Sequence, residues 1–273
     1  MGTSASNRGP SSAVPFDPPW LEEIEIPNIP PPVQSDGDED QTTETQSDKL
    51  SPSARFGNAR RNLSDYVVSG DRGSLRRALG HYSKTGMGGS RKLSNRLKLS
   101  SIVAAGLFSA LQSLSEGNNE PLSTVIAQLL KNDAGIYSVI DEVVRFVCPD
   151  GGSLDETSTR NSVSSALSDF FQDNPDVDIM NLNEDSIWIL ISSFLGYEAF
   201  NRIQLDIGQA FERLESLVSR VSRLNDMRDY LKSEISSQLN AIRKEIARRT
   251  ISDLQEIFQK SIERTFSVFE VSL

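Results

Sequence analysis

Side chains suited to acid–base or nucleophilic chemistry are scarce in this chain of 273 residues, which holds one histidine and one cysteine. A nucleophile–histidine–acid triad could use only His81, and no acid or nucleophile motif surrounds it. Cys148 follows an apolar run, which favours a buried thiol over a reactive one. A hydrolase that uses His81 or Cys148 is therefore the least favoured function, and we predict a non-enzymatic protein.

The acidic residues beside the turn Cys148-Pro149-Asp150-Gly151-Gly152 are candidate ligands for a cation. Asp150, Asp155 and Glu156 lie close to two glycines, but their spacing departs from the EF-hand pattern. Helix capping by Ser153 and Asp155 explains these residues more simply. A single cysteine and a single histidine also exclude thiolate-rich and histidine-cluster sites. We therefore predict no metal site and no cofactor.

Charge divides the chain into three parts whose total is −10. Residues 1–53 carry a net charge of −8, residues 54–99 carry +9, and residues 100–273 carry −11. One interpretation is that the basic region folds back onto the acidic body or tail, because opposite charges attract. The other is that it contacts a polyanion such as nucleic acid. The first is favoured, because the basic region has no interleaved aromatic residues and matches no DNA-binding motif.

The basic region also contains the glycine-rich turn 86–89, flanked by Lys84, Arg91 and Lys92. Such a turn could hold a phosphate, but it lacks the Walker pattern and does not follow a strand. The candidate contacts for a polyanion or a partner protein are Arg76, Arg77, His81, Lys84, Gly86, Gly88, Gly89, Arg91 and Lys92.

Nine of the twelve prolines fall within residues 1–53, among serines and acidic residues. Prolines prevent regular helices and sheets, so we expect a disordered or extended tail. Apolar residues among these prolines suit a segment that docks in extended form on a partner, although packing on the chain's own body is an equal alternative. The candidate partner-docking residues are Thr3, Ser4, Val14, Pro15, Phe16, Pro18, Pro19 and Trp20.

Gly2 could offer an unhindered α-amine once Met1 is removed. The pKa of an α-amine is about 8, so part of it is neutral and nucleophilic near neutral pH. Residues 1–6 also fit the pattern for N-myristoylation, which needs a eukaryotic acyltransferase. Gly2 is therefore a candidate acceptor for a covalent modification.

The elements that position these residues are predicted to be helices, since no segment shows the alternation of a strand. The fold class is all-α, a helical bundle with long C-terminal amphipathic helices. Glycine at 70 and proline at 175 are expected to end helices. The predicted helices cover 53–70, 75–82, 90–116, 122–130, 136–147, 153–171 and 185–197, and 200–269 is predicted to form one or two long helices.

The last predicted segment shows heptad-like rather than strict heptad spacing. We favour a long helix interrupted near Asn225-Asp226. The alternatives are two antiparallel helices packed on the body and a coiled-coil arm. The predicted organisation is an acidic tail with a docking motif (1–53), a basic helical collar (54–99) and a helical body (100–273). The sequence has no spanning apolar segment and no secretion signal, so a cytoplasmic location without membrane contact is expected.

Several motifs, taken in order, resemble the QatB family of the bacterial Qat anti-phage defence system. They are Met1-Gly2-Thr3-Ser4, the Val14-to-Trp20 segment, residues 75–82 with the turn 86–89, and the 148–152 turn. The resemblance covers the tail, the basic collar and this turn, while the long C-terminal helices match in general character only.

The resemblance implies three partners: the ATPase QatA, the QueC-like enzyme QatC and the TatD-like nuclease QatD. QueC-like enzymes activate a deazaguanine carboxylate with ATP and form an amide, and relatives attach the base to an N-terminal glycine. It thus implies modification of Gly2, with Thr3 and Ser4 presenting it. The predicted function is a non-enzymatic adaptor of an anti-phage complex whose tail is presented to the QueC-like partner. The alternative is a nucleic-acid-binding adaptor that uses the 54–99 region.

Overall fold

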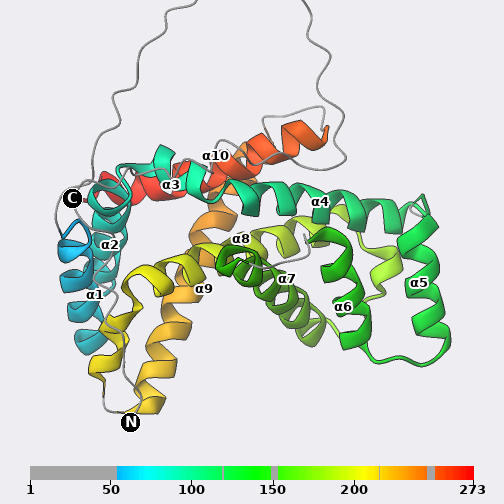
Figure 1. Cartoon of the computed structure of the whole chain (residues 1–273), viewed down its shortest axis with the longest axis horizontal. Helices are drawn as coiled ribbons and strands as arrows, with labels where there is room; N and C mark the ends of the chain where they lie inside the picture. Colours follow the sequence, from blue (N-terminus) through cyan, green and yellow to red (C-terminus); the bar gives the residue numbers. More distant parts are fainter. Residues whose placement is uncertain (1–53, 119, 149–152, 215, 245–249) are drawn as a thin grey trace, which may run out of the picture.

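Helices make up most of the described chain, and no strand occurs in it, which confirms the all-α prediction. The computed structural model describes residues 54–118, 120–148, 153–214, 216–244 and 250–273 (Figure 1). The tail residues 1–53, including Gly2 and Trp20, therefore lie outside the described residues, as do residues 149–152. The α-helices are α1 (Gly57–Ser69), α2 (Arg72–His81), α3 (Ser90–Arg96), α4 (Lys98–Ser115), α5 (Glu120–Lys131), α6 (Ile136–Val147), α7 (Leu154–Asp173), α8 (Glu184–Ile207), α9 (Leu217–Arg243) and α10 (Ile251–Glu270).

Local sequence signals fix several helix ends. Gly70 ends α1 in the left-handed conformation, with φ of 74°, and its N–H donates to the carbonyl of Tyr66. Ser153 begins α7 through a capping box with Glu156, in which each side chain bonds the other residue's backbone N–H. The side chain of Asn183 accepts from the N–H of Ser186 and begins α8. These ends agree with the boundaries that the sequence predicted.

Two predictions about helix continuity were wrong. The single helix expected over 90–116 is two helices, α3 and α4, bent by 60° at Leu97. Leu97 is buried and so lies inside the core at the bend. Asn225-Asp226 do not interrupt a helix, because both lie within α9. The C-terminal region instead divides into the 3-10 turns of Gly208–Arg213, then α9 and α10, so the single long helix that we favoured is replaced by two helices packed on the body.

α10 is the central helix of the assembly, because it packs against α2, α3, α4 and α9. Figure 1 shows it lying along α3 and α4, with α1 and α2 at one end of the molecule and α5 at the other. The C-terminal helix therefore joins the basic region to the rest of the core. At the α2 crossing a Cβ added to Gly80 would lie 2.5 Å from the carbonyl oxygen of Phe269, so this close approach requires glycine.

Aromatic rings connect α4, α8 and α10 in the middle of the core. The ring of Trp188 lies 4.9 Å from that of Phe108 and 5.7 Å from that of Phe258, measured between centroids. All three side chains are buried. Burial over most of α8 confirms the very apolar helix expected there, although α8 continues to Ile207. In the described chain no single helix has the length and apolar character to cross a membrane, although α3 and α4 taken together meet both criteria.

Candidate functional site

The basic region separates into inward-facing and outward-facing cations. We call Arg55, Arg60 and Arg96 the inner arginines, because each has guanidinium nitrogens buried against the body. The side chain of Arg60 donates to the backbone carbonyl of Asp206 on α8 over 3.1 Å. Burial lowers the pKa of Arg55, and repulsion from Arg96 lowers it further. Part of the basic charge therefore serves to join the N-terminal helices to α8.

Asp206 is the shared acceptor of this buried network. The hydroxyl of Tyr82 donates to its carboxylate over 2.8 Å, and Arg202 forms an ion pair with it at 3.4 Å. Arg202 also pairs with Asp155 of α7 at 2.7 Å. Burial and the carboxylate of Asp206 raise the pKa of Tyr82 well above its usual value, so this hydroxyl stays protonated. Residues from α7, α8 and the segment after α2 are thus joined by one set of charges.

The second group of cations lies at the surface. Its members are exposed, and none forms an ion pair with another described residue. We call them the outer cations: Arg61, Arg72, Arg76, Lys84 and Arg91. Three of the predicted contacts, Arg76, Lys84 and Arg91, belong to this group and are open to solvent or to a partner.

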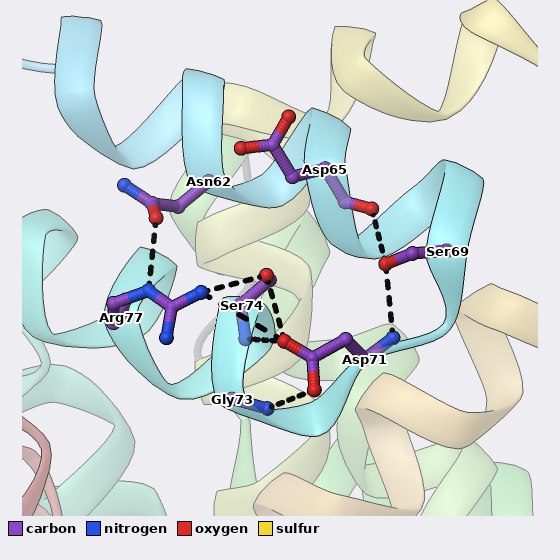
Figure 2. Close-up of polar contacts among 7 residues, drawn as sticks. All are labelled: Asn62, Asp65, Ser69, Asp71, Gly73, Ser74 and Arg77. Atoms are coloured by element: carbon purple, nitrogen blue, oxygen red, sulfur yellow. Dashed lines mark hydrogen bonds and ion pairs between the residues drawn. The ribbon is translucent and has the colours of Figure 1, made fainter.

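Arg77 is exposed but is held within the α1–α2 hairpin, as Figure 2 shows. Its guanidinium donates to Asn62 over 3.3 Å and to the hydroxyl of Ser74 over 2.9 Å. Asp71 begins α2 by accepting hydrogen bonds from the backbone N–H groups of Gly73 and Ser74. The hydroxyl of Ser74 also donates to this carboxylate, and that bond, together with the two backbone bonds, lowers the pKa of Asp71. Arg77 therefore helps to fix the hairpin, in addition to any contact with a partner.

The glycine-rich turn follows a π-helix over Tyr82–Gly86. Its backbone is already hydrogen-bonded: the N–H of Met87 donates to the carbonyl of Tyr82 over 2.9 Å, and that of Gly89 to the carbonyl of Ser83 over 2.9 Å. Gly88 and Gly89 have φ of 82° and 115°, which accounts for glycine at both positions. Gly86 is buried against the ring of Phe56. Two amides that a phosphate cradle would use are thus occupied by the turn itself.

His81 and Cys148, the two residues considered for nucleophilic catalysis, lie in different parts of the structure. His81 ends α2, and burial together with Lys84 lowers the pKa of its imidazole. Cys148 follows α6, and burial raises the pKa of its thiol to about 12. A thiol with that pKa is almost wholly protonated near neutral pH, which disfavours nucleophilic attack. Asp155 and Glu156 serve an ion pair and a helix cap, and no group of metal-ligating side chains occurs in the described part of the chain.

A buried carboxyl group that the sequence analysis missed lies at the centre of the α4–α7–α8 packing. Glu198 is 5 % exposed and accepts hydrogen bonds from Ser100, Thr159 and Ser162 over 2.5, 3.0 and 2.6 Å. Burial raises the pKa of Glu198, although the three hydroxyl donors oppose that shift. Its sequence context, inside the very apolar run of α8, gave only a weak signal: a single charge on a face that should be buried.

Glu198 and Arg202 line a pocket of about 420 Å³ between α7, α8 and the α3–α4 bend. A second pocket, of about 730 Å³, adjoins it between α7, α8 and the start of α9. Ser158 and Leu205 line both pockets, so the two form one groove, which we call the α7–α8 groove. Its lining combines apolar and uncharged polar side chains with both arginines and acids, the latter Asp155, Glu156, Glu198 and Glu212. Such a mixed lining suits recognition of another molecule.

The fold and these sites define an all-α protein with an exposed basic hairpin and a polar groove beside a buried charge network. The sequence model of the family described as QatB, the Qat anti-phage system associated protein QatB, matches residues 88–269. The chain therefore belongs to the QatB family and has a role in the Qat anti-phage defence system. No curated protein and no solved structure matches it.

The matched range contains the α7–α8 groove and the turn residues Gly88 and Gly89, but it begins after α2. The tail and most of the basic collar, which carried much of the resemblance in sequence, precede it, whereas the 148–152 turn lies within it. The match thus rests on the helical body, which had seemed to agree only in general character.

Proposed function

We propose that this protein is an adaptor without its own catalytic centre, in the cytoplasmic Qat complex, that presents its tail to the QueC-like partner QatC. The α-amine of Gly2 is the acceptor of a deazaguanine, Thr3 and Ser4 present it, and the Val14–Trp20 segment docks on the partner. QatA is a second partner, and the nuclease QatD a further one. Family membership supports the setting.

The observation that carries this proposal is the division of the chain into an acidic, proline-rich tail and a helical body joined at a fixed point. Arg55 and Phe56, at the start of the described chain, are both buried. The ring of Phe56 stacks on Tyr82 at 5.6 Å between centroids. The helical body thus holds the chain firmly at Arg55 and Phe56, where the tail ends. This suits presentation of Gly2, because a tail attached to the body raises the local concentration of Gly2 near a bound partner.

Intact-mass measurement of the full chain, co-expressed with and without active QatC, tests the modification. The wild-type chain should gain the mass of the attached group only when the partner is present. Gly2→Pro should gain none and should lose phage protection while the complex still assembles. An unmodified N-terminal peptide in the presence of the active partner would contradict the modification step.

Ser6→Pro is the matched control, because it adds the same proline to the tail and keeps the glycine amine. It should be modified like the wild type. Replacement of both Phe16 and Trp20 by alanine should slow modification without abolishing it, since docking supplies local concentration rather than the reactive group. A wild-type rate for that double variant would remove the docking role of the segment.

A second candidate function, a nucleic-acid-binding adaptor, is favoured by one observation: the outer cations form no ion pair within the described residues. Duplex DNA and RNA should then bind the isolated full chain with an affinity that falls steeply with salt. Replacement of Arg76 and Arg91 by glutamine should weaken binding and reduce the salt dependence. Binding that ignores these replacements would reject the outer cations as the interface.

A further inference from the structure

Large apolar side chains are exposed at two opposite ends of the molecule. Figure 1 shows the α1–α2 hairpin at one end of the long axis and α5 at the other. The exposed apolar residues of the hairpin end are Val68 on α1 and Leu217, Val218 and Val221 on the first turns of α9. Those of the opposite end are Val125 and Leu130 on α5 and Ile136, Tyr137 and Phe146 on α6. Exposed apolar residues that gather in this way are typical of protein–protein contact surfaces.

The start of α9 belongs to the hairpin end because it packs against α1. The hydroxyl of Tyr66 donates to the backbone carbonyl of Arg223 over 3.1 Å, and the guanidinium of Arg223 lies 5.9 Å from the centroid of the Tyr66 ring. The side chain of Arg223 also lies against Gly70, where α1 ends. The hairpin (57–81) and residues 217–223 therefore form one surface, which we call the basic end.

The basic end carries cations beside its apolar residues. Residues 57–81 hold five arginines and two aspartates, which gives a net charge of +3. Arg72 and Arg76 lie one turn apart on α2, and both are exposed and form no ion pair with another described residue. A polyanion would neutralise these cations but would leave Leu217, Val218 and Val221 in water. A surface that offers both acids and apolar side chains matches the basic end better.

The opposite end of the molecule is such a surface. We call residues 116–148, which include α5 and α6, the acidic arm, because five acids and two bases give them a net charge of −3. α5 packs mainly against α6, and α6 packs on α4 and α7, so the outer side of the arm is open. Tyr137 is 71 % exposed, and Asp141 lies one turn further along α6, exposed and without an ion pair among the described residues.

We propose that the basic end of one copy of this protein binds the acidic arm of a second copy, head to tail. The net charges of the two surfaces are equal and opposite, and both surfaces expose apolar side chains, so one contact pairs the charges and buries the apolar groups. A second copy is the occupant that accounts for both ends at once.

The position of the two surfaces determines the kind of assembly. Because they lie at opposite ends of the molecule, each copy can bind two others, and association continues into an open chain or closes as a ring. The contact needs neither QatC nor a modified Gly2. The test below and the intact-mass test of the proposed function can therefore fail independently.

Analytical ultracentrifugation of the full chain measures the association. The mass-average molar mass should rise above the 30.1 kDa of one chain as the concentration increases from about 10 µM to about 1 mM at low salt. It should fall when salt is added, because salt screens the opposite charges. A molar mass that stays at 30.1 kDa over this range at low salt would overturn the proposal.

Charge reversal at each end tests the head-to-tail arrangement. One variant combines Arg72→Glu with Arg76→Glu in the basic end, and the other combines Tyr137→Arg with Asp141→Arg in the acidic arm. Each variant alone should associate at least about tenfold more weakly than the wild type, because like charges then face each other. An equal mixture should form dimers and nothing larger, because each variant retains one intact surface.

Lys244→Glu combined with Lys260→Glu is the matched control for the basic-end variant. It makes the same change in net charge at exposed positions at the end of α9 and within α10, outside both surfaces. The control should associate like the wild type. Equal weakening by the control and the basic-end variant would overturn the proposal, since net charge alone would then explain the loss.

Three further results would also overturn it. Undiminished association of either end variant alone would indicate a symmetric contact that uses only the other surface. A mixture of the two variants that stays monomeric would show that the surfaces do not bind each other. An acidic-arm variant that associates like the wild type but no longer binds QatC would assign the arm to that partner.

Discussion

The inner arginines and the outer cations belong to the same basic region, yet their surroundings differ completely. Arg55 is 6 % exposed and lies within the network of Asp206, whereas Arg76, on α2, is exposed and forms no ion pair within the described residues. A charged group that is buried with its partners is needed for stability, because removing one member leaves the other charges buried and uncompensated. A charge at the surface costs little to change and is available for recognition. Net charge alone therefore overstates how much of this region can meet a polyanion.

The largest loss of stability is expected when Asp206, the shared acceptor of the buried charge network, is replaced. Asp206→Ala should lower the free energy of unfolding by about 3 kcal/mol, because Tyr82 and Arg202 both lose their carboxylate while buried. Urea unfolding of the full chain measures this loss. Asp206→Asn keeps an acceptor for Tyr82 and should lose less stability, and equal losses for both variants would show that charge alone matters.

The next largest loss of stability is expected when Glu198, the buried carboxyl that accepts three hydroxyl hydrogen bonds, is replaced. Glu198→Ala should cost about 1–3 kcal/mol, because three buried hydroxyl donors lose their acceptor. Differential scanning calorimetry at pH 5 measures it. Thr157→Ala, at an exposed position of α7, is a control that should change stability by less than about 0.5 kcal/mol.

The pH dependence of the same residue provides a separate test. Because the folded pKa of Glu198 is raised above 4.5, its protonated form favours the fold. Its contribution to stability is complete below the unfolded pKa and is lost as pH rises through the folded pKa. Glu198→Gln cannot titrate, so the wild type should lose stability relative to this variant as pH rises through the raised folded pKa of Glu198. A constant difference across pH would contradict the raised pKa.

A smaller pH dependence of stability, opposite in sign to that of Glu198, is expected from Asp71 in the exposed α1–α2 hairpin. The folded pKa of Asp71 is lowered below 3.8, so its stabilising effect is present at neutral pH and is lost as pH falls through the folded pKa. Asp71→Ala should therefore lower the melting temperature at pH 7 by a few degrees and leave it unchanged at pH 2. Retention of the difference at pH 2 would show that the carboxylate charge is not what caps α2.

The smallest effect on stability is expected at the outer cations. Arg76→Glu and Arg91→Glu should each change the free energy of unfolding by less than about 0.5 kcal/mol, because both side chains are exposed. The matched inner variant, Arg55→Glu, should destabilise the fold strongly, since it places a second acid beside Asp206 in a buried network. Similar losses for the inner and outer variants would remove the distinction between the two groups.

The helices themselves were largely predictable, because caps and apolar spacing act over a few residues. Gly70 and the Ser153–Glu156 pair mark ends that any local analysis finds. The bend at Leu97 was missed because nothing in its neighbourhood breaks a helix, and the bend depends on packing in the core. Asn225-Asp226 misled for the converse reason: weak helix formers are tolerated inside α9 when its other face is well packed.

The site was less predictable than the fold. The candidate contacts Arg76, Lys84 and Arg91 are exposed, but composition gave no means of separating them from Arg55 and Arg96. Glu198 and the groove beside it were missed, because their partners lie 36 to 98 residues away in the sequence. Such long-range pairs leave no local pattern.

By itself the sequence determined the all-α class, most helix boundaries and the separation of an acidic, proline-rich tail from a helical body, since these follow from propensities and charges of neighbouring residues. The packing of the helices settles which arginines are buried, where α10 joins the basic region to the core, and that a groove lies between α7 and α8. These depend on contacts between residues far apart in the chain, whose energies are fixed only when the helices pack together.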